Sequence, residues 1–278
     1  MSLHISSLNS GSNGNCYYVG NDEDAVLIDV GISCRETEKR MKKLGLDMRK
    51  VKAIFVSHEH GDHIKGVSTL ANKYNLPVFI TPKTAKNGPQ LIKHLSKTFV
   101  ANQPVTIGEL VITAFAKFHD AADPHSFVIS YADTTVAVIT DIGKVCDEVI
   151  RYFKQCQAVF LEANYDKDLL ENGRYPVYLK NRIRGGLGHI SNDEALNLFI
   201  NHRSTNLSHI ILSHLSQENN SAEMVAELFA PYANETEIII ASRYSHTDVF
   251  CINPLKETVK KTATTFTKSS QLRLFEQK

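Results

Sequence analysis

One heptapeptide, S-H-E-H-G-D-H at residues 57–63, constrains the fold of this chain more than any other segment. It directly follows an apolar run, residues 53–56, that is typical of a buried strand. His58 and His60 are two residues apart, so on extended backbone their side chains point to the same side. Gly61 lets the chain turn, so that Asp62 and His63 reach a second point nearby. The segment therefore predicts a buried strand that ends in a loop of metal-ligating side chains.

The number of candidate ligands in this loop indicates how many metal ions it could bind. His58, His60, Asp62 and His63 are more ligands than one ion usually takes from a single short segment. Imidazole and carboxylate groups together suit borderline divalent metals. We therefore expect two ions a few ångströms apart. The alternative is a solvated His-rich turn or an adventitious metal patch.

Hydrophobic periodicity predicts two halves in which strands and helices alternate. The strands are expected at residues 3–7, 16–20, 25–29, 53–57, 77–80, 110–116, 127–131, 135–140, 158–161, 210–212 and 237–241. Helices are expected at 66–74, 146–156 and 224–229, and after S-x-x-E capping boxes at Ser33 and Ser191. Short connections predict one two-sheet α/β (α+β) catalytic domain over residues 1–254, followed by a polar tail at 255–278.

Composition narrows the class of protein and the compartment. A hydrophobic content of 42% with 22% charged residues excludes a disordered chain or a coiled coil. No apolar run approaches the length of a membrane span, and the first ten residues do not read as a secretory signal. Five cysteines without a C-x-x-C pair suit a reducing compartment. We expect a cytoplasmic protein with no membrane partner.

The H-E-H-G-D-H segment, with Leu27-Ile28-Asp29 before it, resembles the metallo-β-lactamase fold superfamily. Three further motifs follow in the family's order, centred on His119, Asp141 and His214. The resemblance implies a four-layer αββα sandwich of two mixed β-sheets. It also implies two divalent ions, zinc first and manganese as the alternative.

The same resemblance implies a distribution of the ligands. His58, His60 and His119 would hold one ion, and Asp62, His63 and His214 the other, with Asp141 between the two. Asp29 would lie behind the site and orient a ligand histidine or the motif loop.

Two further motifs resemble those of nucleases within this superfamily. Gly188-His189-Ile190-Ser191 is similar to a histidine motif of the tRNA 3′-processing endonucleases and the β-CASP nucleases, and residues 161–164 to the segment whose Glu holds that histidine. Residues 10–15, 119–124 and 213–220 are most similar to the small bacterial YycJ/WalJ group of 5′→3′ exonucleases. The resemblance implies a DNA exonuclease in which a metal-bridging hydroxide is the nucleophile. Asp62 would accept its proton, and His189, held by Glu162, would donate one to the leaving oxygen.

Two segments are candidates for contacts with nucleic acid. The glycine-bearing loop at residues 10–15 could present backbone N–H groups to a phosphate near Ser12, Asn13 and Asn15, or it could be a tight hairpin. Residues 174–189 contain four cations and no acids. Cations interleaved with tyrosines suit single-stranded nucleic acid, whereas the alternative is a solvated basic helix. The expected contacts in this segment are Arg174, Tyr175, Tyr178, Lys180, Arg182 and Arg184.

The pentapeptide Q-L-R-L-F near the C-terminus resembles the peptide by which bacterial replication and repair proteins dock on the sliding clamp. We expect Gln271, Leu272, Leu274 and Phe275 to make that contact, although Arg273 departs from the usual small or acidic residue. An unstructured tail or a terminal strand is the alternative. A clamp contact would favour DNA over RNA as the substrate.

Two other functions remain open on the sequence. Hydrolysis of a thioester or lactam, as in glyoxalase II-like relatives, uses the same metals but has no need of the Glu162–His189 pair. A non-catalytic metal-binding or clamp-associated module would not require all seven ligands.

Overall fold

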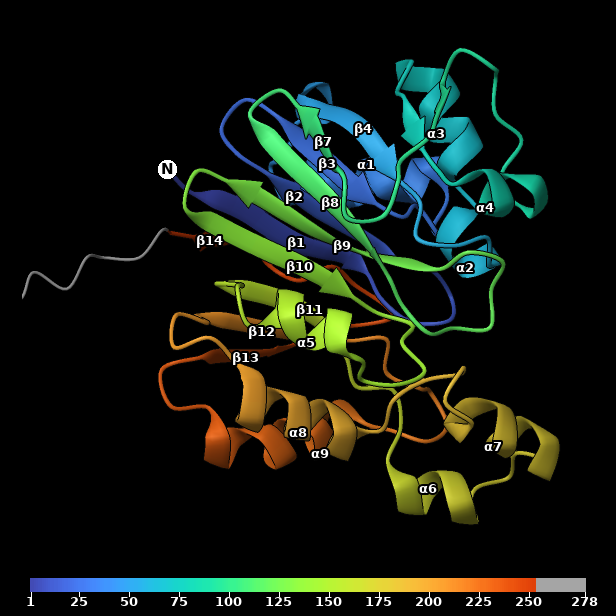
Figure 1. Ribbon diagram of the computed structural model, residues 1–278, viewed down its shortest axis with the longest axis vertical. Helices are drawn as coiled ribbons and strands as arrows, with labels where there is room; N and C mark the ends of the chain where they lie inside the picture. Colours follow the sequence, from blue (N-terminus) through green and yellow to red (C-terminus); the bar gives the residue numbers. More distant parts are fainter. Residues whose placement is uncertain (254–278) are drawn as a thin grey trace, which may run out of the picture.

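The computed structural model describes residues 1–253 and contains two seven-stranded mixed sheets (Figure 1). The first sheet has the order β14-β1-β2-β3-β4-β5-β6; its neighbours are antiparallel from β14 to β3 and parallel from β3 to β6. Its strands are β1 (Leu3–Asn9), β2 (Cys16–Gly20), β3 (Ala25–Ile28), β4 (Val51–Phe55), β5 (Val78–Phe79), β6 (Ser96–Lys97) and β14 (Phe250–Ile252).

The second sheet has the order β13-β12-β11-β10-β9-β8-β7. Its neighbours are antiparallel from β7 to β10 and parallel from β10 to β13. Its strands are β7 (Pro104–Ile107), β8 (Leu110–Ala116), β9 (His125–Tyr131), β10 (Thr134–Ile139), β11 (Ala158–Glu162), β12 (His209–Ser213) and β13 (Glu237–Ile240).

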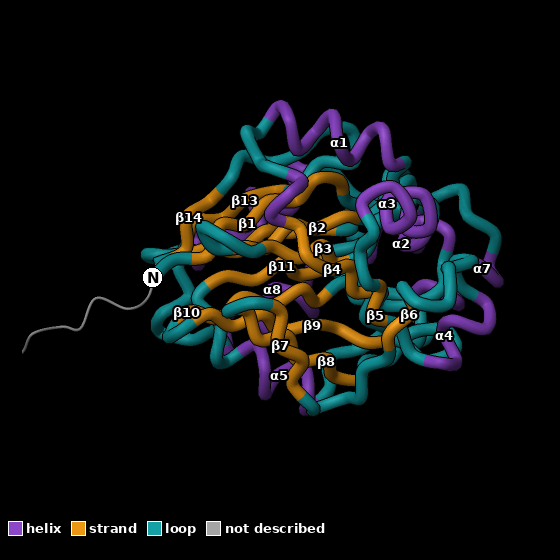
Figure 2. Tube along the Cα trace, turned by 90° about the horizontal axis from the view of Figure 1, so that it is seen from above, coloured by secondary structure: helices purple, strands orange, loops and turns teal. Residues whose placement is uncertain are grey.

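Helices cover the outer face of each sheet. Helices α1 (Cys34–Lys43) and α3 (Val67–Tyr74) pack on the first sheet through Met41 and Leu70. Helices α5 (Asp147–Phe153), α8 (Asn192–His202) and α9 (Ala222–Phe229) pack on the second through Phe153, Phe199 and Phe229. Figure 2 shows this αββα order from above. The remaining helices are α2 (Gly61–Ile64), α4 (Pro82–Asn87), α6 (Lys167–Asn172), α7 (Val177–Arg184) and the 3₁₀ turns η1 (Met48–Lys50) and η2 (Ala230–Tyr232).

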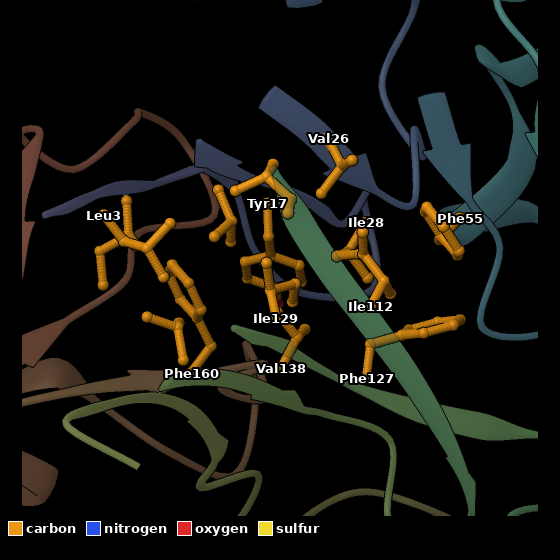
Figure 3. Packing of buried hydrophobic residues seen from close by; sticks show 14 of the residues in the cluster. Leu3, Tyr17, Val26, Ile28, Phe55, Ile112, Phe127, Ile129, Val138 and Phe160 are labelled. Carbon is orange, nitrogen blue, oxygen red and sulfur yellow. The ribbon is translucent and has the colours of Figure 1, made fainter. Parts of the chain in front are cut away.

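The main core lies between the two sheets (Figure 3). Alternate residues of each strand point inward, so that Tyr17 on β2 meets Phe160 on β11 with ring centroids 5.0 Å apart. Phe55 on β4 meets Phe127 on β9 edge-on at 5.6 Å. These buried contacts across the sandwich confirm the predicted fold class and its four layers.

Most predicted elements are present, and the differences are local. Ser191 and Glu194 form the expected capping box. Ser33 caps α1, but Glu36 bonds Arg40 at 2.9 Å instead of returning to the Ser33 backbone. The basic stretch forms helix α7, which with α6 builds a separate small cluster around Leu170 and Ile183 at one end of the sandwich (Figure 1).

The polar tail and its clamp-like peptide lie outside the described residues. The boundary at 254/255 and the contacts of Gln271, Leu272, Leu274 and Phe275 therefore stay predictions. Within residues 1–253, no helix combines the length and apolar character needed to span a bilayer.

Candidate metal centre

Strand ends position the predicted site. Asp29 follows β3, the segment from His58 to His63 follows β4, and Asp141 follows β10. Glu162 is the last residue of β11, and His214 follows β12. Because these strands end at the same edge of the two facing sheets, their last side chains converge on one place.

Three of these residues adopt a backbone conformation that is uncommon for residues other than glycine. Asp29, Asp141 and His214 have φ values of 59°, 54° and 59°. Left-handed backbone at a residue with a side chain costs free energy and persists where the surrounding structure enforces it. Each of these strands therefore stops abruptly, and its next side chain turns toward the site.

The first ligand cluster consists of His58, His60 and His119. His60 Nδ1 lies 3.1 Å from His58 Nε2 and 3.3 Å from His119 Nε2. A tetrahedral ion with metal–nitrogen bonds of about 2.0–2.1 Å places its nitrogens about 3.3–3.4 Å apart. Both distances from His60 are close to this spacing, and the three nitrogens lie within 4.8 Å of one another, so the cluster could hold one zinc-like ion.

The second cluster consists of Asp62, His63, Asp141 and His214, whose ligand atoms all lie within 4.8 Å of one another. Asp141 Oδ2 is 3.2 Å from His63 Nε2, and Asp141 Oδ1 is 3.4 Å from His214 Nε2. Asp141 Oδ1 is also 4.0 Å from His119 Nε2, so this carboxylate lies between the clusters.

Two atoms of the second cluster are buried without a hydrogen bond. Asp141 Oδ2 and His214 Nε2 have no hydrogen-bond partner among the described residues. Buried polar atoms are seldom left unpaired, because this costs roughly 1–3 kcal/mol each. A divalent cation would satisfy both, so the donor set fits the metals that the fold implies.

Hydrogen bonds from behind fix which ring nitrogen faces the site. Asp29 Oδ2 lies 2.7 Å from His63 Nδ1 and accepts from Ser57 Oγ at 2.7 Å. His119 Nδ1 is 2.9 Å from the Gly188 carbonyl oxygen, to which it donates. In the neutral form of both imidazoles the proton is therefore on Nδ1, and Nε2 has the lone pair that a metal binds. Asp29 lies where the sequence predicted it, behind a ligand histidine.

Glu162 connects the second cluster to His189. Its Oε1 lies 2.7 Å from His189 Nδ1 and 3.2 Å from His214 Nδ1, and its Oε2 accepts from the Ile142 backbone N–H at 2.8 Å. The ring of His189 lies next to those of His119 and His214, with centroid distances of 5.5 and 5.1 Å. The predicted pairing of Glu162 with His189 is present beside both clusters.

Buried charge divides the site into two electrostatic halves. Burial lowers the pKa of His119 to about 4 and the pKa of His58 well below its ordinary value, so both imidazoles are neutral. Burial acts in the same direction on His214, but Asp141 and the neighbouring carboxylates outweigh it and raise the pKa of His214 to about 10. The second half thus has an excess of negative charge that a cation would neutralise.

Four residues that contact this site were not predicted. Ser10 Oγ accepts from the His214 backbone N–H at 2.7 Å, and Asn164 Nδ2 donates to the His214 carbonyl at 2.7 Å. Ser57 bonds Asp29, and buried Lys117 donates to the carbonyl before Asp141 at 2.7 Å. Ser10, Ser57 and Asn164 stand inside the quoted motifs, but their contacts are long-range in sequence. Lys117 carries no sequence signal beyond its position two residues before His119.

A pocket of about 220 Å³ opens over the two ligand clusters, and only some of the predicted nucleic-acid contacts line it. Ser12, Tyr175 and Arg182 do. The Arg182 guanidinium also pairs with Asp120, at 2.5 Å. Arg174 and Tyr175 line a neighbouring hollow near α6.

The other predicted contacts lie away from this pocket. Tyr178 is exposed on α7, Lys180 Nζ donates to the Glu171 carbonyl at 2.6 Å, and Arg184 pairs with the Glu171 carboxylate. The basic stretch is thus partly neutralised by its own neighbours.

Asn13 and Asn15 hold the loop at residues 10–15 in place. Asn13 Nδ2 donates to the Arg243 carbonyl at 2.6 Å. Asn15 is fully buried, and its amide lies 3.2 Å from Asp62 Oδ2 and 3.0 Å from His63 Nε2. The predicted phosphate contact concerned backbone N–H groups of this loop, and that of Asn15 donates to the Asp62 carbonyl at 2.7 Å.

Comparison with known proteins agrees with the geometry. The family model of the metallo-beta-lactamase superfamily matches residues 10–178. The chain belongs to this superfamily. It is 38% identical over 228 residues to the exodeoxyribonuclease YycJ of Bacillus anthracis, which covers 81% of this chain and 86% of that protein.

A second relative and a solved structure agree with this assignment. The exodeoxyribonuclease WalJ of Streptococcus pneumoniae serotype 2 is 32% identical over 224 residues, covering 78% of this chain and 83% of that protein. The crystal structure of the metallo-beta-lactamase fold protein YhfI from Bacillus subtilis superimposes with a TM-score of 0.70 at 18% identity. It covers 90% of this chain and 99% of YhfI, and it supports the fold. The resemblance inferred from the motifs is confirmed at the level of family and fold.

Proposed function

We propose that this protein is a two-metal phosphodiesterase that degrades DNA from the 5′ end. The observation that carries the proposal is the pairing of buried Glu162 with partly exposed His189 beside two ligand clusters. A hydrolase of small thioesters or lactams would need the clusters but not this pair. The two relatives named exodeoxyribonucleases, each aligned over more than three quarters of the chain, support the same substrate class.

The ligand sets follow from the two clusters. His58, His60 and His119 would hold one ion, and Asp62, His63 and His214 the second, with Asp141 shared. Zinc fits the imidazole-rich first set, and manganese would be accepted by the carboxylate-rich second set. When bound, such a pair of ions supplies an activated water as nucleophile and neutralises charge on the phosphodiester.

Side chains outside the ligand sets would handle the leaving group and the strand. Glu162 engages Nδ1 of His189, which leaves Nε2 available to the pocket. From there His189 would bind a phosphate oxygen and give a proton to the leaving oxygen. Asp62 lines the pocket and would accept a proton from the attacking water. Tyr175 and Arg182 would contact the strand at the pocket wall.

The test is a comparison of wild type with His189→Ala. We expect 5′-phosphorylated DNA to be degraded by wild type and at least about a hundredfold more slowly by the variant, the usual contribution of a positioned proton donor. Bound metal, measured by mass spectrometry after gel filtration, should be the same in both. DNA cleavage that persists in the variant at the wild-type rate would overturn the assignment. Thioesterase activity that survives in the variant would favour the glyoxalase-like alternative.

A further inference from the structure

A second pocket of about 250 Å³ adjoins the catalytic pocket. Leu215, Ile240 and Ala241 contribute apolar surface, and Gln217, Ser242 and Tyr244 are among the polar residues around it. Ser216 lines both pockets. His214 lines the catalytic pocket and the next residue, Leu215, lines the second. The segment that follows β12 therefore lies between the two pockets.

The wall of this pocket is an aromatic and cationic surface. Tyr244 is 72% exposed, and the Arg243 guanidinium carbon lies 5.9 Å from the centre of its ring. The positive charge of this guanidinium attracts the phosphates of a strand that approaches the pocket. An exposed tyrosine next to a cation is a surface on which a base stacks.

Backbone contacts join this wall to the ligand loop. The Ser10 N–H donates to the Ser242 carbonyl at 3.3 Å, and Asn13 Nδ2 donates to the Arg243 carbonyl at 2.6 Å. The same loop holds His214 through Ser10 Oγ and contacts His63 through Asn15. The second pocket is therefore held at a fixed place relative to the metal ligands.

We propose that this pocket receives one nucleobase of the DNA strand whose phosphodiester lies at the metal centre. This rests on the proposed function and names a subsite for it. A volume of about 250 Å³ is below the roughly 300 Å³ at which pockets begin to hold drug-sized ligands, so it suits a single planar base. Tyr244 stacks on the base face, the exposed amide of Gln217 reaches acceptors on its edge, and the charge of Arg243 attracts the adjoining phosphate.

The test uses short 5′-phosphorylated oligonucleotides in which one nucleotide at a time is abasic. With wild type, removal of the base at a single position near the 5′ end should lower kcat/KM about tenfold, within the range of base–aromatic stacking. Affinity should fall as well but by a smaller factor, measured by fluorescence anisotropy in the His189→Ala background, because part of the loss falls on kcat. Equal rates and affinities for every abasic oligonucleotide would overturn the proposal.

Variants of the pocket test whether the loss caused by base removal arises there. Tyr244→Ala, and Ala222→Phe on the lining, should slow cleavage of the intact oligonucleotide about as much as base removal does in wild type. Both should lose nothing further on the abasic oligonucleotide. Tyr232→Ala removes an exposed tyrosine outside either pocket. This variant should discriminate between the intact and the abasic oligonucleotide as strongly as wild type does. Discrimination that survives in Tyr244→Ala and Ala222→Phe would place the base elsewhere and overturn the proposal.

The two readouts separate this proposal from the proposed function. If metal-loaded wild type degrades no oligonucleotide, the nuclease assignment fails. The ratio of affinities for intact and abasic oligonucleotides then still decides for or against the pocket.

Discussion

Glu162→Gln tests the connection between the metal ligands and the proposed proton donor. The substitution keeps the shape of the side chain and removes its charge. Burial raises the pKa of Glu162, but His189 and His214 outweigh it and bring the pKa below its ordinary value, so the native side chain is an acceptor only. Three donors face it: two imidazole N–H groups at 2.7 and 3.2 Å and the Ile142 N–H at 2.8 Å.

The magnitude follows from this count. A carboxamide has one acceptor oxygen and a donor group of its own. If its oxygen faces the imidazoles, its NH₂ group meets the Ile142 N–H, and the reverse orientation leaves the imidazoles without an acceptor. At least one buried donor thus loses its partner, at a cost of about 1–3 kcal/mol. Loss of an outer partner of a metal ligand typically lowers metal affinity or activity about 10–100-fold.

Three measurements follow the effect of Glu162→Gln. We expect DNA cleavage to fall about 10–100-fold, the second metal to dissociate at higher free-metal concentration, and the free energy of unfolding to fall by about 1–3 kcal/mol. His189→Ala should lower activity alone, because His189 lies outside both ligand sets. Glu227→Gln, on an exposed face of α9, is the matched control and should behave as wild type. A Glu162→Gln variant with unchanged metal affinity would refute the coupling through His214.

Four further outcomes are expected. A Cβ at Gly31 would overlap the Asp62 carbonyl oxygen, so Gly31→Ala should lower the free energy of unfolding by about 1–3 kcal/mol and weaken metal binding. If urea unfolding and metal titration give the same values for the variant as for wild type, this close contact is contradicted. Lys117→Met removes a buried hydrogen bond next to Asp141 and should lower the free energy of unfolding of the metal-free protein by about 1–3 kcal/mol; an unchanged value in urea unfolding would contradict a contribution of this bond to stability. Burial lowers the pKa of His125, so on acidification the unfolded chain binds a proton before the folded protein does, and the free energy of unfolding falls as the pH drops below about 6.5. His125→Asn should make this fall less steep, by at most about 1.4 kcal/mol per pH unit. Melting temperatures that depend on pH in the same way in the variant and in wild type would exclude the effect. A chelator should lower the melting temperature and added zinc should restore it, whereas a melting temperature indifferent to both would contradict the metal centre.

The sequence predicted well which side chains gather at this edge of the sheets, because most of them come shortly after the end of a strand. A ligand at that position depends on two local features, an apolar run and the polar residue that stops it, and both can be read in sequence. His58, Asp141 and His214 are found in this way. The distribution of the ligands over two ions came from the order of the motifs in the family that the sequence resembles. The left-handed backbone at Asp141 and His214 shows how local the arrangement is.

The nucleic-acid contacts were harder to predict, because a charge in the sequence does not reveal its partner. Arg182 and Arg184 read as phosphate contacts, yet in the fold they meet Asp120 and Glu171. Asn15 reads as part of a phosphate-binding loop, yet its amide points inward to Asp62 and His63. Such pairings depend on contacts between segments far apart in the chain, which periodicity and spacing do not report.

One loop, residues 10–15, contacts both the candidate metal ligands and the wall of the second pocket. Ser10 and Asn15 hold ligands of the second cluster, while Ser10 and Asn13 hold the wall that carries Arg243. A base seated against that wall therefore contacts a structure that also positions His214. Part of the binding energy of a group remote from the scissile bond can in this way be used for alignment at the reacting centre, and that part appears in kcat rather than in KM. The abasic substrates should thus lose turnover at saturation as well as affinity, a split that a pocket without connection to the ligands would not produce.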